Sequence, residues 1–77
     1  MTVIDAELGR RVRSVRVTGG WTQRDLAAMA GITQSRLSRI ESGDAGMNVH
    51  DLAALARLFG DDFAADLVEL LTRENAA

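Results

Sequence analysis

The chain contains no cysteine and no proline, and it has one histidine, His50. Without cysteine there is no disulfide framework and no thiolate metal site, and one histidine among scattered carboxylates does not form a zinc site. We therefore expect no metal, no cofactor and a reducing compartment, the cytoplasm. Enzymes are the weakest functional class, because no Ser/His/Asp constellation, phosphate loop or metal set is present.

Long apolar runs are also missing. No segment approaches the roughly 20 apolar residues that a membrane-spanning helix needs, and the first ten residues do not resemble a signal peptide. With 77 residues, we expect one domain over residues 1–77 and no membrane association. A core of this size is marginal unless helices pack efficiently or a second copy adds buried area.

Lysine is absent as well, so all nine basic residues are arginine, a bias that GC-rich coding explains better than function does. The net charge of −2 hides an asymmetry. Residues 8–40 hold seven arginines and one acid, whereas residues 41–77 hold two arginines and eight acids. Because salt screens charges beyond about 8 to 10 Å, the basic half can bind a polyanion while the acidic half faces away.

In the absence of proline, glycines mark the boundaries between the helical segments. Glycines at positions 19, 20, 31, 43, 46 and 60 separate segments whose apolar residues recur at helical spacing. The sequence predicts an all-α domain of five helices, of which the first runs from about Asp5 to Val17 and the fifth over about residues 62–73. The second, third and fourth predicted helices each have a polar residue that is expected to cap their N-terminus, namely Thr22, Thr33 and Asn48. Each of these residues lies between an apolar residue and a helical segment.

The second and third predicted helices, at about 23–30 and 34–41, are separated only by Gly31-Ile32-Thr33. This connection is too short for antiparallel packing. It predicts a helix-turn-helix over about residues 22–41, in which the second helix enters the major groove of DNA.

The predicted helix at 34–41 has two different faces. At about 100° per residue, Leu37 and Ile40 point together toward a core. The candidate base-reading residues on the opposite face are Gln34, Ser35, Ser38 and Arg39. Glutamine can pair with adenine, arginine with guanine and serine with either base, although such a face taken alone is more often simply solvated.

The string LGRRVRSVRVTGGWTQRDLAAMAGITQSRLSRIESG, followed by LAALARLFG, resembles the Cro and lambda-repressor type of helix-turn-helix, also called the XRE family. The resemblance covers roughly residues 8–60 and implies a compact, five-helix, lambda-repressor-like domain that binds double-stranded DNA. It implies that Gln23 bonds a phosphate and braces Gln34, and that Arg16 and Glu41 form a buried structural salt bridge. The residues expected beside the DNA backbone are Gln23, Arg24, Thr33, Arg36 and Ser42.

The loop SGDAGMNVH departs from this pattern. Many relatives have a proline there, and Asp44 stands where a basic residue would help to bind phosphate. Phosphate binding is then left to the arginines of the first three helices, which predicts modest affinity with a strong salt dependence.

Trp21 and His50 can each be interpreted as a structural residue or as a functional one. Trp21 precedes a cap, where a hydrophobic staple to the core is favoured over stacking on a base. The lone His50 is favoured as a solvated surface residue over a phosphate or partner contact.

The fifth predicted helix carries a wide apolar strip, in which the candidate dimerisation residues are Phe63, Leu67, Val68 and Leu71. The strip can complete the core of one chain or form a homodimer. A twofold dimer favours an inverted-repeat operator. The predicted function is a sequence-specific transcriptional regulator, and specifically a repressor. The alternative is a protein-interaction module, such as an antitoxin or a regulator partner, that binds a protein through its acidic half.

Overall fold

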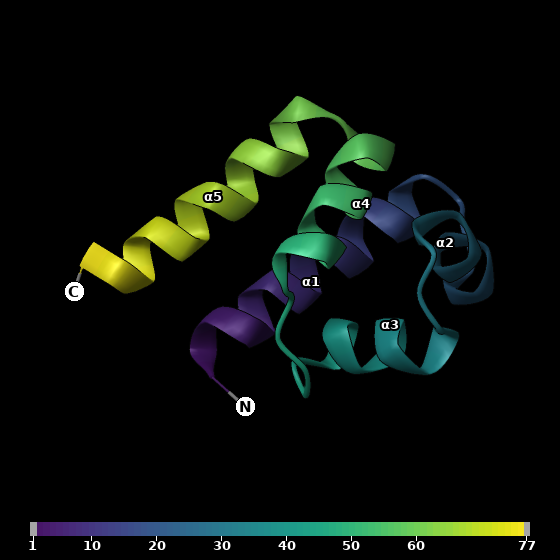
Figure 1. Ribbon diagram of the computed structural model, residues 1–77, viewed down its shortest axis with the longest axis horizontal. Coiled ribbons are helices and arrows are strands. Elements are labelled where there is room, and N and C mark those ends of the chain that lie inside the picture. The colour runs from purple at the N-terminus through teal and green to yellow at the C-terminus, as the bar shows by residue number, and fades with distance from the viewer. Residues whose placement is uncertain (1, 77) are drawn as a thin grey trace.

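The computed structural model describes residues 2–76, without the side chains of Leu71 and of residues 73–76. The helices are α1 (Val3–Thr18), α2 (Gln23–Ala30), α3 (Gln34–Ser42), α4 (Val49–Phe59) and α5 (Asp61–Ala76). The pair α2 and α3 forms one end of the molecule, and α5 crosses the other (Figure 1). Over the described residues, no helix combines the length and the apolar character needed to cross a bilayer.

Polar caps begin the first four helices. The hydroxyls of Thr2, Thr22 and Thr33 each accept a hydrogen bond from a backbone N–H three residues later. At α4 the Asn48 side chain accepts the N–H of Asp51 at 2.8 Å, and the Asp51 carboxylate accepts the N–H of Asn48 at 3.0 Å, which completes a capping box. The three predicted caps are confirmed, and Thr2 begins α1 two residues earlier than expected.

The turn between α2 and α3 depends on glycine. Gly31 adopts a left-handed conformation with φ of 72°, which a residue with a Cβ adopts only under strain. The N–H of Ile32 then bonds the carbonyl oxygen of Ala27 at 3.0 Å, so α2 ends and the chain turns sharply into α3.

The core is made mostly of aliphatic side chains, which come from all five helices, together with Phe63. Its fully enclosed members are Val12, Leu26, Leu37, Ile40, Leu55, Leu67 and Leu70. The helix α5 packs against α1 and α4 and thereby completes the core of a single chain.

This packing corrects one expectation about α5. Phe63 and Leu67 are only 5% and 0% exposed, so neither side chain lies on a surface where a second copy could contact it. Val68, by contrast, is 54% exposed. The fourth predicted contact, the side chain of Leu71, lies outside the described residues.

The helices α1 and α3 approach closely at Gly9. A Cβ atom at this position would lie 2.3 Å from the carbonyl oxygen of Ile40 and 2.7 Å from that of Glu41. Because both neighbours are backbone atoms, the clash cannot be relieved by a side-chain rotation, and glycine sets the distance between the two helices.

Replacing Gly9 with alanine is therefore expected to destabilise the protein by about 1 to 3 kcal/mol, the usual cost of overpacking. Helix propensity alone predicts the opposite sign, a gain of up to about 1 kcal/mol. Denaturant unfolding followed by circular dichroism measures the difference. The control is Ser14→Ala, at an exposed position of the same helix, with an expected change within about 0.5 kcal/mol. A Gly9→Ala protein as stable as the wild type would contradict the close approach.

Candidate nucleic-acid interface

The exposed face of α3 carries the four side chains predicted to read bases. Gln34, Ser35, Ser38 and Arg39 are all exposed, whereas Leu37 and Ile40 are 0% and 1% exposed and point into the core. Within the described residues, none of the four exposed side chains forms a hydrogen bond or an ion pair. Their donors and acceptors are therefore available to a ligand.

An ion pair anchors the C-terminal half of α3 to α1. Arg16 donates from Nε to Oε2 of Glu41 at 2.7 Å and from Nη2 to Oε1 at 3.0 Å. Its Nη1 donates to the backbone oxygen of Trp21 at 2.9 Å. The side chains are 13% and 4% exposed, so the pair is largely enclosed. The hydrogen bond to Glu41 raises the pKa of Arg16, against the lowering effect of burial, and the charge of Glu41 adds to the rise.

Gln23, at the start of α2, braces α3 through a partner other than the expected one. Its amide Nε2 donates to Oε1 of Glu41 at 3.2 Å, whereas the family resemblance implies a brace to Gln34. An ionised carboxylate is the stronger acceptor for a neutral amide, which accounts for the difference. Glu41 thus holds Arg16 and Gln23 together.

Arg13 belongs to the same region, although the sequence did not single it out. It lines a polar hollow of about 280 Å³ together with Arg16, Gln23, Ser38, Glu41 and Ser42. The signal was its spacing: Arg13 lies three positions before Arg16, on the same side of α1. A cation beside serine hydroxyls and an amide is a set of groups that suits a phosphate oxygen.

Arg36 makes an internal contact where a phosphate contact was expected. Its Nε donates to Oδ1 of Asp51 at 3.3 Å, its Nη2 donates to Oδ2 of the same carboxylate, and Nη2 also reaches the backbone oxygen of Gly46 at 3.4 Å. The Asp51 side chain is 4% exposed. In this structure a buried carboxylate therefore holds the guanidinium of Arg36, the residue that was expected beside the DNA backbone.

The pKa of Asp51 reflects this contact. Burial raises the pKa, but the hydrogen bond from Arg36 lowers it, with further lowering from the Asn48 backbone N–H and from the charges of Arg36 and His50. The net result is a pKa below the ordinary value for aspartate. The carboxyl therefore stays ionised and paired at neutral pH.

The other three residues expected near the DNA backbone differ in their surroundings. Arg24 is exposed on α2 and has no hydrogen bond or ion pair within the described residues. The Thr33 hydroxyl caps α3. The Ser42 hydroxyl has one proton to donate, and two acceptors lie 3.1 Å from its oxygen, the Arg39 backbone oxygen and Asp44 Oδ2.

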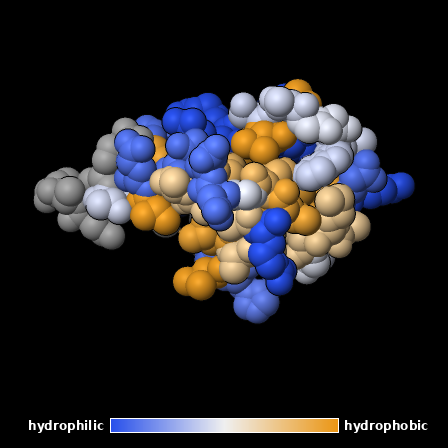
Figure 2. Space-filling model, turned by 90° about the horizontal axis from the view of Figure 1, so that it is seen from above, coloured by the Kyte–Doolittle hydropathy of each residue, from blue (hydrophilic) through white to orange (hydrophobic). Residues whose placement is uncertain are grey.

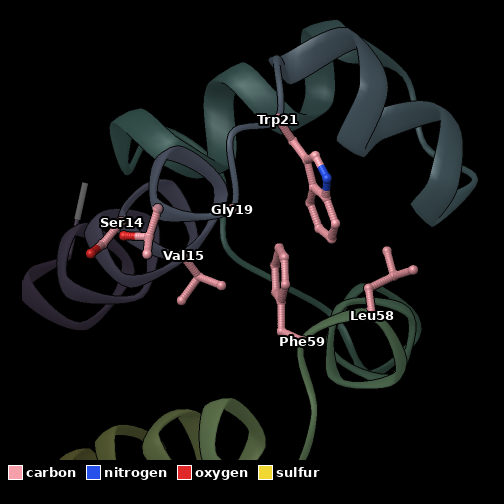
Figure 3. A pocket seen from close by; sticks show the side chains of 7 residues that line it. Ser14, Val15, Gly19, Trp21, Leu58 and Phe59 are labelled. Atoms are coloured by element: carbon pink, nitrogen blue, oxygen red, sulfur yellow. The ribbon is translucent and has the colours of Figure 1, made fainter.

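Trp21 packs against aromatic side chains of the fold. Its ring stacks on Phe59 with centroids 5.4 Å apart, and Phe59 meets Phe63 edge-on at 5.0 Å. Figure 3 shows Trp21 and Phe59 facing each other, with Leu58 and Val15 beside them, around a mostly apolar hollow of about 330 Å³. Such a lining does not suit a polyanion, and the predicted staple role of Trp21 agrees with this packing.

Known proteins resemble this chain in sequence. Residues 7–71 match the model of a protein family described as a helix-turn-helix domain. Over 53 residues the chain is 38% identical to the competence pilus inhibition repressor of Acinetobacter baylyi, a match that covers 69% of this chain and 48% of that protein. The chain thus spans about half the length of this relative.

Two solved structures resemble it in fold. The restriction-modification controller protein C.AhdI from Aeromonas hydrophila aligns with a TM-score of 0.74 at 23% identity, over 82% of this chain and 94% of that one. The clp gene regulator ClgR from C. glutamicum aligns with a TM-score of 0.77 at 24% identity, over 96% and 95% of the two chains. These likenesses concern the fold alone, and they confirm the predicted five-helix architecture.

The enclosed ion pair predicts a large effect of a small substitution. Glu41→Gln leaves Arg16 without its counter-charge and is expected to cost about 3 to 5 kcal/mol of unfolding free energy. The matched control is Asp66→Asn, which breaks the 3.5 Å pair between Arg11 and Asp66, whose side chains are 53% and 48% exposed. Its expected cost is below about 1 kcal/mol. Equal losses in the two variants, measured by chemical denaturation, would contradict the structural role of the buried pair.

The lowered pKa of Asp51 predicts a pH dependence with a defined sign. A carboxyl whose folded pKa lies below its unfolded value of about 3.9 stabilises the fold above that pH, and this contribution disappears as the pH falls through the folded pKa. We expect Asp51→Asn to be less stable than the wild type by a constant amount above about pH 5, with the gap closing below about pH 4. Thermal unfolding from pH 7 to pH 2 measures it. A gap that widens on acidification would refute the assignment.

Proposed function

Because this chain belongs to the helix-turn-helix domain family of DNA-binding transcriptional regulators, we propose that it acts in the cytoplasm as a repressor that binds an inverted-repeat operator as a homodimer. The match to a protein named as a repressor supports the sign of regulation. No cofactor is part of this proposal.

The observation that carries the proposal is the unpartnered polar face of α3. A helix that keeps Leu37 and Ile40 in the core presents its other face in one fixed direction. We assign base reading to Gln34, Ser35, Ser38 and Arg39, because amide, hydroxyl and guanidinium groups are those that distinguish base edges in the major groove.

Phosphate contacts are proposed for residues on both sides of this face. Arg24 is exposed and unpaired within the described residues, and Arg13 lines the polar hollow beside Gln23. The hydroxyls of Thr33 and Ser42 lie at the two ends of α3. With so few cations, affinity is expected to be modest, and its fall with salt is expected to be shallow, since each phosphate contact adds only about 0.9 to the slope.

A homodimer is supported by exposed apolar side chains on α4 and α5. Val68 on α5 is 54% exposed and Val49 on α4 is 82% exposed, and Figure 2 shows hydrophobic side chains gathered in the middle of one face between hydrophilic ones. A twofold dimer that places two copies of α3 about 34 Å apart would contact successive major grooves. The half-sites of the operator would then be inverted and one helical turn apart.

Selection from a random double-stranded DNA library, at two salt concentrations, tests the proposal. The expected result is an inverted repeat with half-sites about 10 base pairs apart, bound with two chains per site in sedimentation experiments. Enrichment of a single half-site would support sequence-specific DNA binding and contradict the homodimer. Weak binding without sequence preference that vanishes with salt would refute the regulator, and a protein partner would become the leading function.

The same DNA then tests the residues. The double variant with Gln34→Ala and Arg39→Ala is expected to lose operator binding and to keep its melting temperature within a few degrees, because both side chains are exposed. The matched control is Arg57→Ala, which removes one exposed arginine from α4 and should bind the operator as tightly as the wild type does.

A further inference from the structure

The helix α3 is held at both ends by ion pairs to different helices. Near its C-terminus, Glu41 pairs with Arg16 of α1. In its first turn, Arg36 pairs with Asp51 of α4. Of the exposed polar face, Ser38 and Arg39 lie between these two anchors, and Gln34 and Ser35 directly precede Arg36.

The second anchor joins two helices whose backbones make few close approaches, although both contribute side chains to the common core. The extensively packed helix pairs of the described chain are α1 with α3, α1 with α5, α2 with α3, α2 with α4, and α4 with α5, and the pair α3 with α4 is not among them. Arg36 reaches across to Asp51 on α4 and to the backbone oxygen of Gly46 in the intervening loop. One side chain thus ties the first turn of α3 to both the loop and α4.

Both carboxylate oxygens of Asp51 are used in this arrangement. Oδ1 accepts from Nε of Arg36, and Oδ2 accepts from Nη2 of Arg36 and from the backbone N–H of Asn48. If Arg36 turned outward to a phosphate, it would leave a carboxylate that is 4% exposed without its counter-charge. An unpaired buried charge is costly, so the guanidinium is expected to stay on Asp51 when DNA binds.

We propose that Arg36 and Asp51 are positioning residues for base recognition, which fix the first turn of α3 against α4 and take no part in phosphate binding. The inference rests on the proposed function, since it concerns how Gln34 and Ser35 meet base edges. Hydrogen bonds to bases weaken steeply with misalignment, whereas attraction to phosphate is long-range and tolerant of small displacements. A loosened first turn therefore lowers discrimination between DNA sequences more than it lowers overall affinity.

The test removes both charges together, with Arg36→Gln and Asp51→Asn, so that no unpaired buried charge remains. The matched control is Arg11→Gln with Asp66→Asn, the same two substitutions at the exposed pair between α1 and α5. For each protein, the dissociation constants for the selected operator and for a scrambled duplex are measured over a range of salt concentrations. We expect the first double variant to lose about tenfold in the ratio of the two constants, the size of one base contact, with an unchanged salt slope. The control double variant should show the wild-type ratio of dissociation constants and the wild-type salt slope.

In the DNA measurements on the first double variant, two outcomes would overturn the proposal. If Arg36 binds a phosphate, the salt slope of the first double variant falls by about 0.9 and both duplexes weaken alike. If the ratio and the slope both equal those of the wild type, the pair has no role in recognition. Arg36→Lys covers the case in which the double variant does not fold. Lysine keeps a positive charge beside the buried carboxylate but cannot bind both of its oxygens as the arginine fork does. If this variant discriminates between the two duplexes as well as the wild type does, the proposal is also overturned.

Amide hydrogen exchange on the free protein separates this inference from the proposed function. In the first double variant we expect faster exchange in the first turns of α3 and α4, at amides such as those of Leu37 and Leu52, with α1 unchanged. Wild-type exchange rates there would refute the positioning role whatever the DNA results. A wild-type protein that discriminates no DNA sequence, combined with faster exchange in the variant, would refute the proposed function alone.

Discussion

The enclosed ion pair between Arg16 and Glu41 is the interaction on which the rest of the structure depends. Arg16 also binds the backbone oxygen of Trp21, and Glu41 also binds Gln23, so the pair joins α1, the turn after it, α2 and α3. Gly9 permits the close approach of backbones that brings α1 and α3 together. A pair buried to this degree must be complete, since either partner alone would be an uncompensated charge in the interior.

The direction of the polar face of α3 follows from this constraint. Because Glu41 is held from one side and Leu37 and Ile40 are in the core, rotation of α3 about its own axis would break the ion pair and expose apolar side chains. The second pair, between Arg36 and Asp51, acts at the other end of the same helix. A scaffold that fixes both ends of a short helix suits a task in which hydrogen-bond geometry decides which DNA sequence is bound.

Local features of the fold can be predicted from the order of the residues alone. Thr22, Thr33 and Asn48 cap their helices through bonds to residues three positions away, and Gly31 ends α2 through its own backbone conformation. Helical periodicity likewise placed Leu37 and Ile40 inside and left the polar face of α3 outside. Such features depend on neighbours within one turn, and one turn of helix is visible in the order of the residues.

The sequence by itself thus determined the helices, the tight turn and the polar face of α3, while the tertiary structure decided which polar and apolar groups remain available. Arg36 finds its partner 15 residues away and Gln23 finds Glu41 18 residues away, so neither contact follows from local spacing. The enclosure of Phe63 and Leu67 needed α1 and α4 to close over α5. The physical reason is that the energies of charge pairing and apolar burial depend on distance and solvent exposure, and both are set only when remote helices meet.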